Sequence, residues 1–217
     1  HMVNLPSISE AVHRNAPALV GVDVTQALGR IPLELTGADL IVSSTHKWIL
    51  ASHGGGLIGV PSARADDWRV PAGGWFHLED AFGPSRFDKA VSRPGAISFS
   101  VGMPNYPAVY AIRAGLEYVR NTGIAAIEKA TRPLVETCLE GLKEMPVELL
   151  TPPEMDSIAG ILAFKHPQAD RIEKHLHGQN IHVMSHAGRL RVAIHGYNTP
   201  ADIATLLQEL RSAISQL

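Results

Sequence analysis

The chain carries little charge, a single cysteine and no long apolar run. Of its 217 residues, 18% are charged, and the formal net charge is −2. A charge this close to zero gives no electrostatic reason to expect nucleic acid or an anionic membrane as a partner. One cysteine excludes an intramolecular disulfide and is compatible with a reducing compartment. No stretch approaches the roughly 20 apolar residues of a membrane span, so we expect a cytoplasmic protein without a membrane segment.

The rest of the composition is typical of a globular protein. Hydrophobic residues make up 45% of the chain, and a chain of this length can bury a core in one or two domains. Two apolar runs, residues 19–22 and 40–42, each end in a polar cluster. The polar side chains are Asp23, Thr25 and Gln26 after the first run, and Ser43, Ser44, Thr45, His46 and Lys47 after the second.

This pattern predicts two buried parallel strands that deliver side chains to a cleft. Such strands present the residues at their carboxyl ends to a common edge of the sheet. A lysine just beyond one strand, facing an acidic residue beyond its neighbour, is the arrangement needed to hold pyridoxal phosphate (PLP) with its ring nitrogen protonated. The pair Lys47 and Asp23 therefore predicts a PLP site.

Residues 18–48 resemble the cofactor-binding core of the class V aminotransferase family, the fold-type-I PLP enzymes that include cysteine desulfurases and other carbon–sulfur lyases. The shared motif is Asp-x-x-Gln followed about 20 residues later by Ser-x-His-Lys. The resemblance implies an α/β fold that comprises the carboxyl-terminal part of a fold-type-I large domain, with a partial, mostly parallel sheet, and then a small α+β domain. The expected domains are residues 1–122, a PLP-binding large-domain remnant, and residues 123–217, the small domain.

The resemblance also implies a role for each residue of the motif. Lys47 is the Schiff-base lysine, and it is a catalytic candidate together with His46. Asp23 binds the pyridine nitrogen of PLP, and Gln26 binds the phenolic oxygen of the ring. Ser44 and His46 bind the phosphate.

Three further motifs follow in the family's order. They are Gly73-Gly74-Trp75, Gly102-Met103-Pro104-Asn105 and Arg189-Leu190-Arg191-Val192, the last followed by Tyr197-Asn198-Thr199. By the resemblance, Arg191 binds the substrate carboxylate, a task suited to its planar, bidentate guanidinium. The alternative is a structural salt bridge, because an arginine inside an apolar strand needs an anionic partner or solvent. Met103 stands where the family usually has a hydroxyl residue that helps to hold the phosphate of a neighbouring subunit.

The implied function is that of a PLP-dependent lyase or aminotransferase acting on an amino acid through a Lys47 imine. Family members carry a large additional segment before this point, which brings most of the phosphate cup and several strands. We therefore expect an amino-terminally truncated chain that binds PLP weakly and loses it on dialysis. Uncovered strand edges and apolar faces predict a homo-oligomer.

Other functions remain open at this stage. A serine among Ser43, Ser44 and Ser52 could pair with His46 or His53 in a hydrolase of activated esters, although no Gly-x-Ser-x-Gly elbow is present. An inactive, oligomerising remnant or one half of a split enzyme is a third possibility. Histidines crowd the final third of the chain, but no zinc-binding spacing supports a metal site, and none is predicted.

The expected elements follow from periodicity and capping signals. We expect helices over residues 7–15, from 107 to about 121, over 124–145 with a kink or break at Pro133, over 169–177 and from 199 onward. Strands are expected at 19–22, 40–42, 57–60, 147–150, 158–164, 181–184 and 190–195. The family resemblance implies that the third of these runs antiparallel to the first two. Residues 61–104 are expected to be mostly loop.

Overall fold

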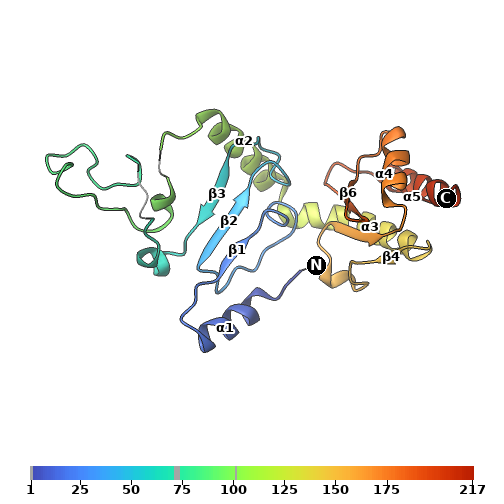
Figure 1. Cartoon of the computed structure of the whole chain (residues 1–217), viewed down its shortest axis with the longest axis horizontal. Helices are drawn as coiled ribbons and strands as arrows, with labels where there is room; N and C mark the ends of the chain where they lie inside the picture. The colour runs from blue at the N-terminus through green and yellow to red at the C-terminus, as the bar shows by residue number, and fades with distance from the viewer. Residues whose placement is uncertain (1, 71–73, 101) are drawn as a thin grey trace. The chain divides into compact units, whose positions relative to one another are not determined.

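The structure is a computed structural model that describes residues 2–70, 74–100 and 102–217 (Figure 1). It divides into two compact units. The amino-terminal unit consists of Asn4–Gly29 and Leu33–Asn121, and the carboxyl-terminal unit consists of Thr122–Leu217 with Arg30–Pro32 and the described residues before Asn4. Each unit contains a sheet of its own.

The sheet of the amino-terminal unit has three strands in the order β1-β2-β3. They are β1 Gly21–Asp23, β2 Leu40–Ser44 and β3 Gly56–Gly59. Strands β1 and β2 run parallel, as the sequence pattern predicted, and β3 runs antiparallel to β2, as the family resemblance implied.

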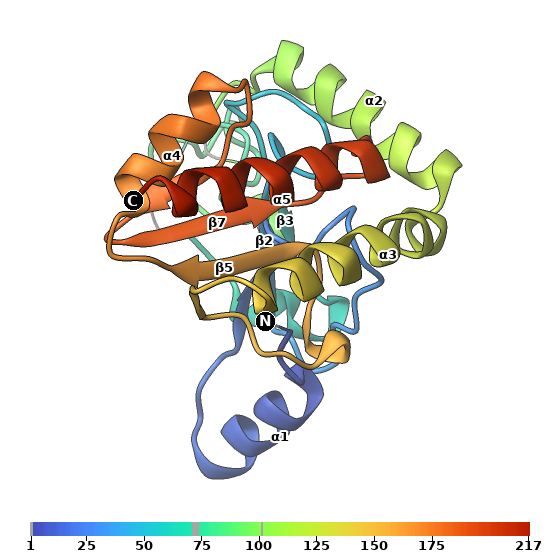
Figure 2. The same ribbon diagram turned by 90° about the vertical axis from the view of Figure 1, so that its right-hand side faces the viewer.

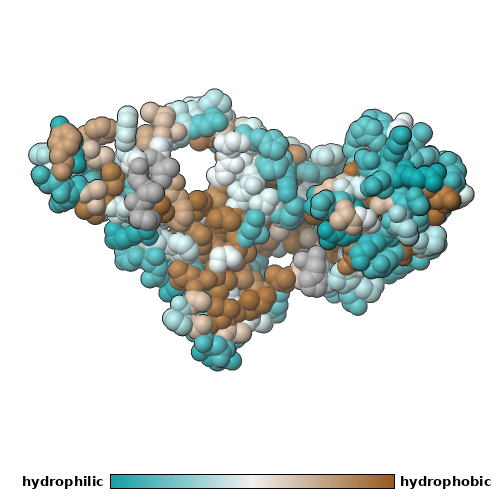
Figure 3. All heavy atoms as spheres, in the orientation of Figure 1, coloured by the Kyte–Doolittle hydropathy of each residue, from teal (hydrophilic) through white to brown (hydrophobic). Residues whose placement is uncertain are grey.

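Apolar side chains remain exposed on this sheet. Leu19, just before β1, is 42% exposed, and Ile58 in β3 is 39% exposed. Figure 3 shows apolar residues gathered at the surface over the three strands. A contiguous exposed apolar surface of this kind usually marks an interaction site.

Helix α1, Leu5–Asn15, begins earlier than predicted. Its cap is Asn4, whose side-chain oxygen accepts a hydrogen bond of 3.1 Å from the backbone N–H of Ser7. Ser7, the predicted cap, therefore lies in the first turn, because asparagine is an equally good cap residue. Near the other end of the helix, His13 Nε2 lies 2.8 Å from the buried carboxylate of Asp39, just before β2.

Helix α2, Tyr106–Thr122, packs against the segment that follows Lys47. The contact is at Gly115, where a Cβ atom would lie 2.2 Å from the carbonyl oxygen of Ile49. Only glycine lets the two backbones approach this closely. The helix thereby braces Trp48 and Ile49, which are 6% and 1% exposed.

The segment from 61 to 104 is mostly irregular, as expected. Among its described residues, it contains the short 3-10 helices η1 Ser62–Asp67 and η2 Gly95–Phe99, and a bridge between Leu78 and Ser92. Of the glycine motif in this segment, Gly73 lies outside the described residues.

The carboxyl-terminal unit has an antiparallel sheet in the order β4-β5-β7-β6. Its strands are β4 Glu148–Leu149, β5 Ile161–Lys165, β6 Met184–His186 and β7 Arg189–Ala193. Strand β6 was expected to begin at residue 181, but it begins at Met184, where the pairing with β7 starts. The two strands are joined by a tight turn. That turn is Ala187-Gly188, with φ angles of 51° and 73°, the left-handed conformations that a two-residue hairpin requires.

Three helices lie on one face of this sheet (Figure 2). They are α3 Ile124–Lys143, α4 Ala169–Gly178 and α5 Pro200–Ser215. Helix α3 is continuous, so of the kink or break expected at Pro133, the break does not occur. The core between helices and sheet includes Cys138, which is 0% exposed and whose burial raises the thiol pKa to about 12.

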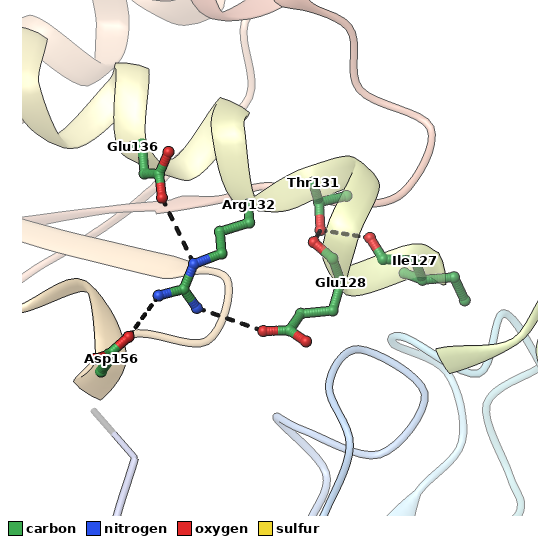
Figure 4. Close-up of polar contacts among 6 residues, drawn as sticks. All are labelled: Ile127, Glu128, Thr131, Arg132, Glu136 and Asp156. Atoms are coloured by element: carbon green, nitrogen blue, oxygen red, sulfur yellow. Dashed lines mark hydrogen bonds and ion pairs between the residues drawn. The ribbon is translucent and has the colours of Figure 1, made fainter. Parts of the chain in front are cut away.

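A surface network ties helix α3 to the 3-10 helix η3, Met155–Ser157. The guanidinium of Arg132 reaches Glu128 and Glu136 on its own helix, both at 3.5 Å, and Asp156 of η3 at 2.6 Å (Figure 4). These groups are partly or fully exposed, so the network fixes local geometry more than it adds stability.

Candidate active site

The register of the parallel strands brings the two polar clusters to one edge of the sheet. Asp23, the last residue of β1, is paired with Val42, and the backbone N–H of Val24 donates to the carbonyl oxygen of Val42 at 2.9 Å. Strand β2 then ends at Ser44, so the residues after Asp23 and those after Ser44 leave the sheet on the same side. Lys47 follows three residues later in a bend.

Thr25 links the two strand ends directly. Its backbone N–H donates to Asp23 Oδ1 at 2.8 Å, and its hydroxyl oxygen accepts from the backbone N–H of Ser44 at 2.8 Å. The sequence placed Thr25 in the polar cluster without giving it a role. Its position two residues after a strand-end aspartate is the signal for this turn.

Asp23 is an ionised carboxylate at the protein surface. Hydrogen bonds from the side chain and backbone of Thr25 lower its pKa most. Burial opposes them, and the positive charge of Lys47 makes a smaller contribution that also lowers the pKa. Asp23 and Lys47 thus follow the ends of two neighbouring strands at this edge of the sheet.

The bend that carries Lys47 is held on both sides. Before it, the hydroxyl of Thr45, a residue 0% exposed, donates to the carbonyl oxygens of Ser52 and Gly55 at 3.3 and 3.2 Å. After it, the backbone N–H of Leu50 donates to the carbonyl oxygen of Lys47 at 3.0 Å. Lys47 itself is half-buried, so its backbone is fixed while its side chain keeps access to solvent.

His46 stacks on His53. The ring centroids lie 4.0 Å apart, with 18° between the ring planes. Desolvation is the main effect that lowers the pKa of His46, and the positive charges of His53 and Lys47 lower it further. His46 is therefore held toward its neutral form. The sequence did not predict this pair, because His53 lies in a glycine-rich turn.

The candidate serine hydroxyls are not hydrogen-bonded to the histidines in the described part of the chain. Ser43 Oγ donates to the carbonyl oxygen of Ser44 at 2.8 Å. Within the described part of the chain, no hydrogen bond joins the hydroxyl of Ser43, Ser44 or Ser52 to His46 or His53. The geometry of a serine nucleophile activated by a histidine base is thus not present in this arrangement.

Gln26 lies half-buried in the turn after β1, close in sequence to Asp23. No hydrogen bond joins its side chain to another described residue, so its amide is available to a ligand.

Arg191 belongs to the carboxyl-terminal unit, in the middle of β7. Its neighbours Leu190 and Val192 are buried beneath the helices, so the arginine side chain projects from the other face of the sheet. Among the described residues it forms no ion pair, and its Nε is buried without a hydrogen-bond partner. The described residues therefore offer Arg191 no partner for a structural salt bridge, and its guanidinium can donate hydrogen bonds to a ligand carboxylate.

The described residues contain neither a candidate metal site nor a membrane-spanning helix. Residues 2–70, 74–100 and 102–217 contain no group of three or more histidine, cysteine, aspartate or glutamate side chains that could hold a metal ion. Within the same residues, every helix is too short or too polar to cross a membrane.

Comparisons with known proteins agree with this architecture. The profile of the aminotransferase class-V family matches residues 2–206. The chain is 27% identical to a probable cysteine desulfurase of Pyrococcus abyssi, over 92% of this chain and 53% of the relative. The cysteine desulfurase of Thermococcus onnurineus NA1 superposes with a TM-score of 0.86 at 22% identity, covering 99% of this chain and 56% of that one.

A third similar structure is a mutant of the protein C-DES with glycine covalently linked to its PLP cofactor. It superposes with a TM-score of 0.78 at 24% identity, over 97% of this chain and 56% of that chain. The chain belongs to the class V aminotransferase family. Its fold is that of the carboxyl-terminal part of fold-type-I PLP enzymes, and it spans about half the length of these relatives.

Proposed function

We propose that this chain is a PLP-dependent lyase or aminotransferase that acts on an amino acid. The observation that carries the proposal is that Asp23 ends β1 and Lys47 follows the end of the neighbouring parallel strand β2, so both lie at the same edge of the sheet. In this proposal residues 1–122 form the cofactor-binding domain and residues 123–217 the small domain.

The residues present fit PLP. The cofactor needs an amine for its aldehyde carbon, an anion for its protonated ring nitrogen and donors for its phosphate. Lys47 supplies the amine and Asp23 the anion. Gln26 has an unengaged amide for the phenolic oxygen, and Ser44 and His46 supply donors for the phosphate.

When bound, PLP supplies an electron sink that stabilises negative charge on the substrate carbon next to the amino group. The residues of the chain do the rest. Asp23 holds the proton on the ring nitrogen, since its lowered pKa keeps it anionic at neutral pH. Lys47 Nζ removes the proton from the substrate α-carbon and returns a proton later as a general acid. His46, held toward its neutral form, offers one ring N–H to the phosphate without adding a full charge.

Arg191 would select the substrate. A guanidinium with no ionic partner among the described residues is suited to bind an α-carboxylate in a bidentate manner. This restricts the substrate class to amino acids and excludes simple amines.

The only cysteine argues against a desulfurase that carries sulfur on this chain. Persulfide chemistry needs a reactive thiolate, whereas Cys138 is fully buried in the core and its pKa is about 12. Carbon–sulfur lysis without a protein-bound persulfide, or transamination, fits the residues better.

We also propose that this polypeptide binds PLP weakly and self-associates. Asp23 is exposed and Lys47 only half-buried, so water competes for both groups. The exposed apolar surface over β1 to β3 is the surface that we propose a second copy covers.

Titration with PLP, followed by the visible absorbance of the protein-bound cofactor, tests the proposal. We expect a new visible band that disappears on dialysis and never forms with Lys47→Ala. A band of equal strength in Lys47→Ala would contradict it.

A further inference from the structure

The carboxyl-terminal unit contains a cavity of about 320 Å³ that plays no part in the proposed function. It lies between the end of β7, residues 179–183 before β6, and the first two turns of α5. This volume is at the lower end of the range for small-molecule sites, about 300 to 1,000 Å³. All of its lining residues belong to the one unit.

The backbone of Ala193 opens toward this cavity. Ala193 is paired with Ile161 of β5, and the N–H of the next residue, Ile194, donates to the carbonyl oxygen of Gly160 at 2.9 Å. In an antiparallel ladder the bonding direction alternates, so the N–H and C=O of Ala193 point away from β5. They face the side on which β6 lies.

Strand β6 does not reach that far. Its last pair with β7 is Met184 with Arg191, and His182, the residue that would pair with Ala193, has left the ladder. No hydrogen bond joins the N–H or C=O of Ala193 to another described residue. His182 and Ala193 both line the cavity, which therefore separates two backbones that would otherwise pair. A donor and an acceptor are left open to whatever fills it.

Asp202 adds a negative charge to the wall. It lies in the first turn of α5, where its Oδ2 accepts a hydrogen bond of 2.8 Å from the backbone N–H of Thr199. Hydrogen bonds from Thr199 lower the pKa of Asp202, so the carboxylate is ionised at neutral pH. Its second oxygen, Oδ1, has no hydrogen bond among the described residues.

The remaining wall is partly apolar and partly weakly basic. Ile181, Val183, Ile203 and Leu206 line the cavity with aliphatic surface. The imidazole of His182 is the one basic side chain among the lining residues. A ligand that satisfies these groups needs a cation for Asp202, an acceptor for the Ala193 N–H and an apolar body.

We propose that this cavity binds a free aliphatic α-amino acid. The ammonium group would lie between Asp202 Oδ1 and the carbonyl oxygen of Ala193, and the carboxylate would accept from the Ala193 N–H and His182. The aliphatic side chain would pack on Ile203 and Leu206. The site differs from the substrate site around Arg191, whose side chain projects from the opposite face of the sheet. An amino acid bound here is an effector or a product sensed by the protein, and its binding does not depend on PLP.

The test is a titration of the methyl-labelled full chain with L-leucine, followed by NMR. We expect the methyl signals of Ile181, Ile203 and Leu206 to shift and to saturate with a dissociation constant on the order of 1 mM or lower. Lys47→Ala should give the same result, which separates this site from the proposed PLP site. No shift at these methyl groups, or shifts confined to the amino-terminal unit, would overturn the proposal.

Two variants of the cavity lining, one matched control variant and two analogues sharpen the test. Asp202→Asn keeps an acceptor for the Thr199 N–H but removes the charge, and should weaken L-leucine binding about tenfold or more. Asp170→Asn, in the first turn of α4 and outside the cavity lining, is the matched control and should leave binding unchanged. Thr205→Phe, at an exposed position of the lining, should block the cavity without disturbing the core.

The analogues 3-methylbutylamine and 4-methylpentanoate each lack one charged group of L-leucine, and each should bind about tenfold or more weakly. The proposal is wrong if Asp202→Asn binds L-leucine as tightly as the unsubstituted chain. It is also wrong if either analogue binds as tightly as L-leucine.

Discussion

The imidazole rings of His46 and His53 lie parallel, with their centroids 4.0 Å apart. A positive charge on one ring disfavours a positive charge on the other, and this is one of the causes that lower the pKa of His46. Lys47, next to His46 in the chain, adds a further positive charge. The contact with His53 thus favours the neutral form of His46 beside Lys47.

Replacing His53 should raise the pKa of His46. His53→Ala removes a like charge and admits water to the ring, and both changes favour the protonated form of His46. The pKa is read from the titration of the His46 ring-proton signal in NMR spectra. His186→Ala, at an exposed position of β6, serves as the control and should leave the His46 pKa where it was. A His46 pKa that stays the same or falls in His53→Ala would show that the stack does not hold it down.

Gly115→Ala should destabilise the amino-terminal unit. The new Cβ would lie 2.2 Å from the carbonyl oxygen of Ile49, so α2 must move off the segment after Lys47. Overpacking of this kind costs about 1–3 kcal/mol of unfolding free energy. Gly178→Ala, also in a helix, is the matched control, since nothing lies within 4 Å of its added Cβ. Chemical denaturation should show a lower unfolding free energy for Gly115→Ala only, and equal stability of the two variants would refute the close contact.

Arg191→Lys should weaken amino-acid binding to the PLP-loaded protein about tenfold or more, because lysine cannot form the bidentate contact with a carboxylate. The affinity for PLP itself should stay the same. Arg189→Lys, two residues away on the same strand and exposed, should change neither. Titrations of L-alanine into the loaded protein and of PLP into the free protein measure the two affinities. Equal losses of both in Arg191→Lys would support a structural role.

Self-association should depend on the apolar surface beside β1. Leu19 is 42% exposed next to an edge strand, and a lysine there would place a charge in any interface formed over it. We expect light scattering to report an oligomer for the unsubstituted chain and a shift toward monomer for Leu19→Lys. Leu150→Lys is the control, because Leu150 is similarly exposed, at 37%, and lies in the other unit. A stable monomer of the unsubstituted chain at micromolar concentration would contradict the expectation.

The strands near the site were predictable because apolar runs that end in polar clusters are a strong local signal. The parallel pairing of β1 with β2 followed from it, whereas the antiparallel direction of β3 followed from the family resemblance. The stack of His46 on His53 was not predictable, since it depends on how a glycine-rich turn folds back. The family resemblance did not predict this stack either, because His53 is not part of the family motif.

Element boundaries were predicted less well, and the reasons are local. Asn4 displaced Ser7 as the cap of α1, because both residue types serve that role. Pro133 did not break α3, where Lys129, whose carbonyl would accept the missing hydrogen bond, is exposed to water. Strand β6 began late because residues 181–183 line a cavity beside β7 without pairing to it.

The central claim is that Lys47 holds PLP, and chemical trapping tests it most directly. The chain is incubated with PLP, reduced with borohydride and digested, and the modified lysine is identified by mass spectrometry. We expect the phosphopyridoxyl group on Lys47 in preference to Lys143, a partly exposed lysine on α3, and a lower yield in Asp23→Asn. Label spread evenly over the lysines, or an undiminished total yield in Lys47→Ala, would contradict the account.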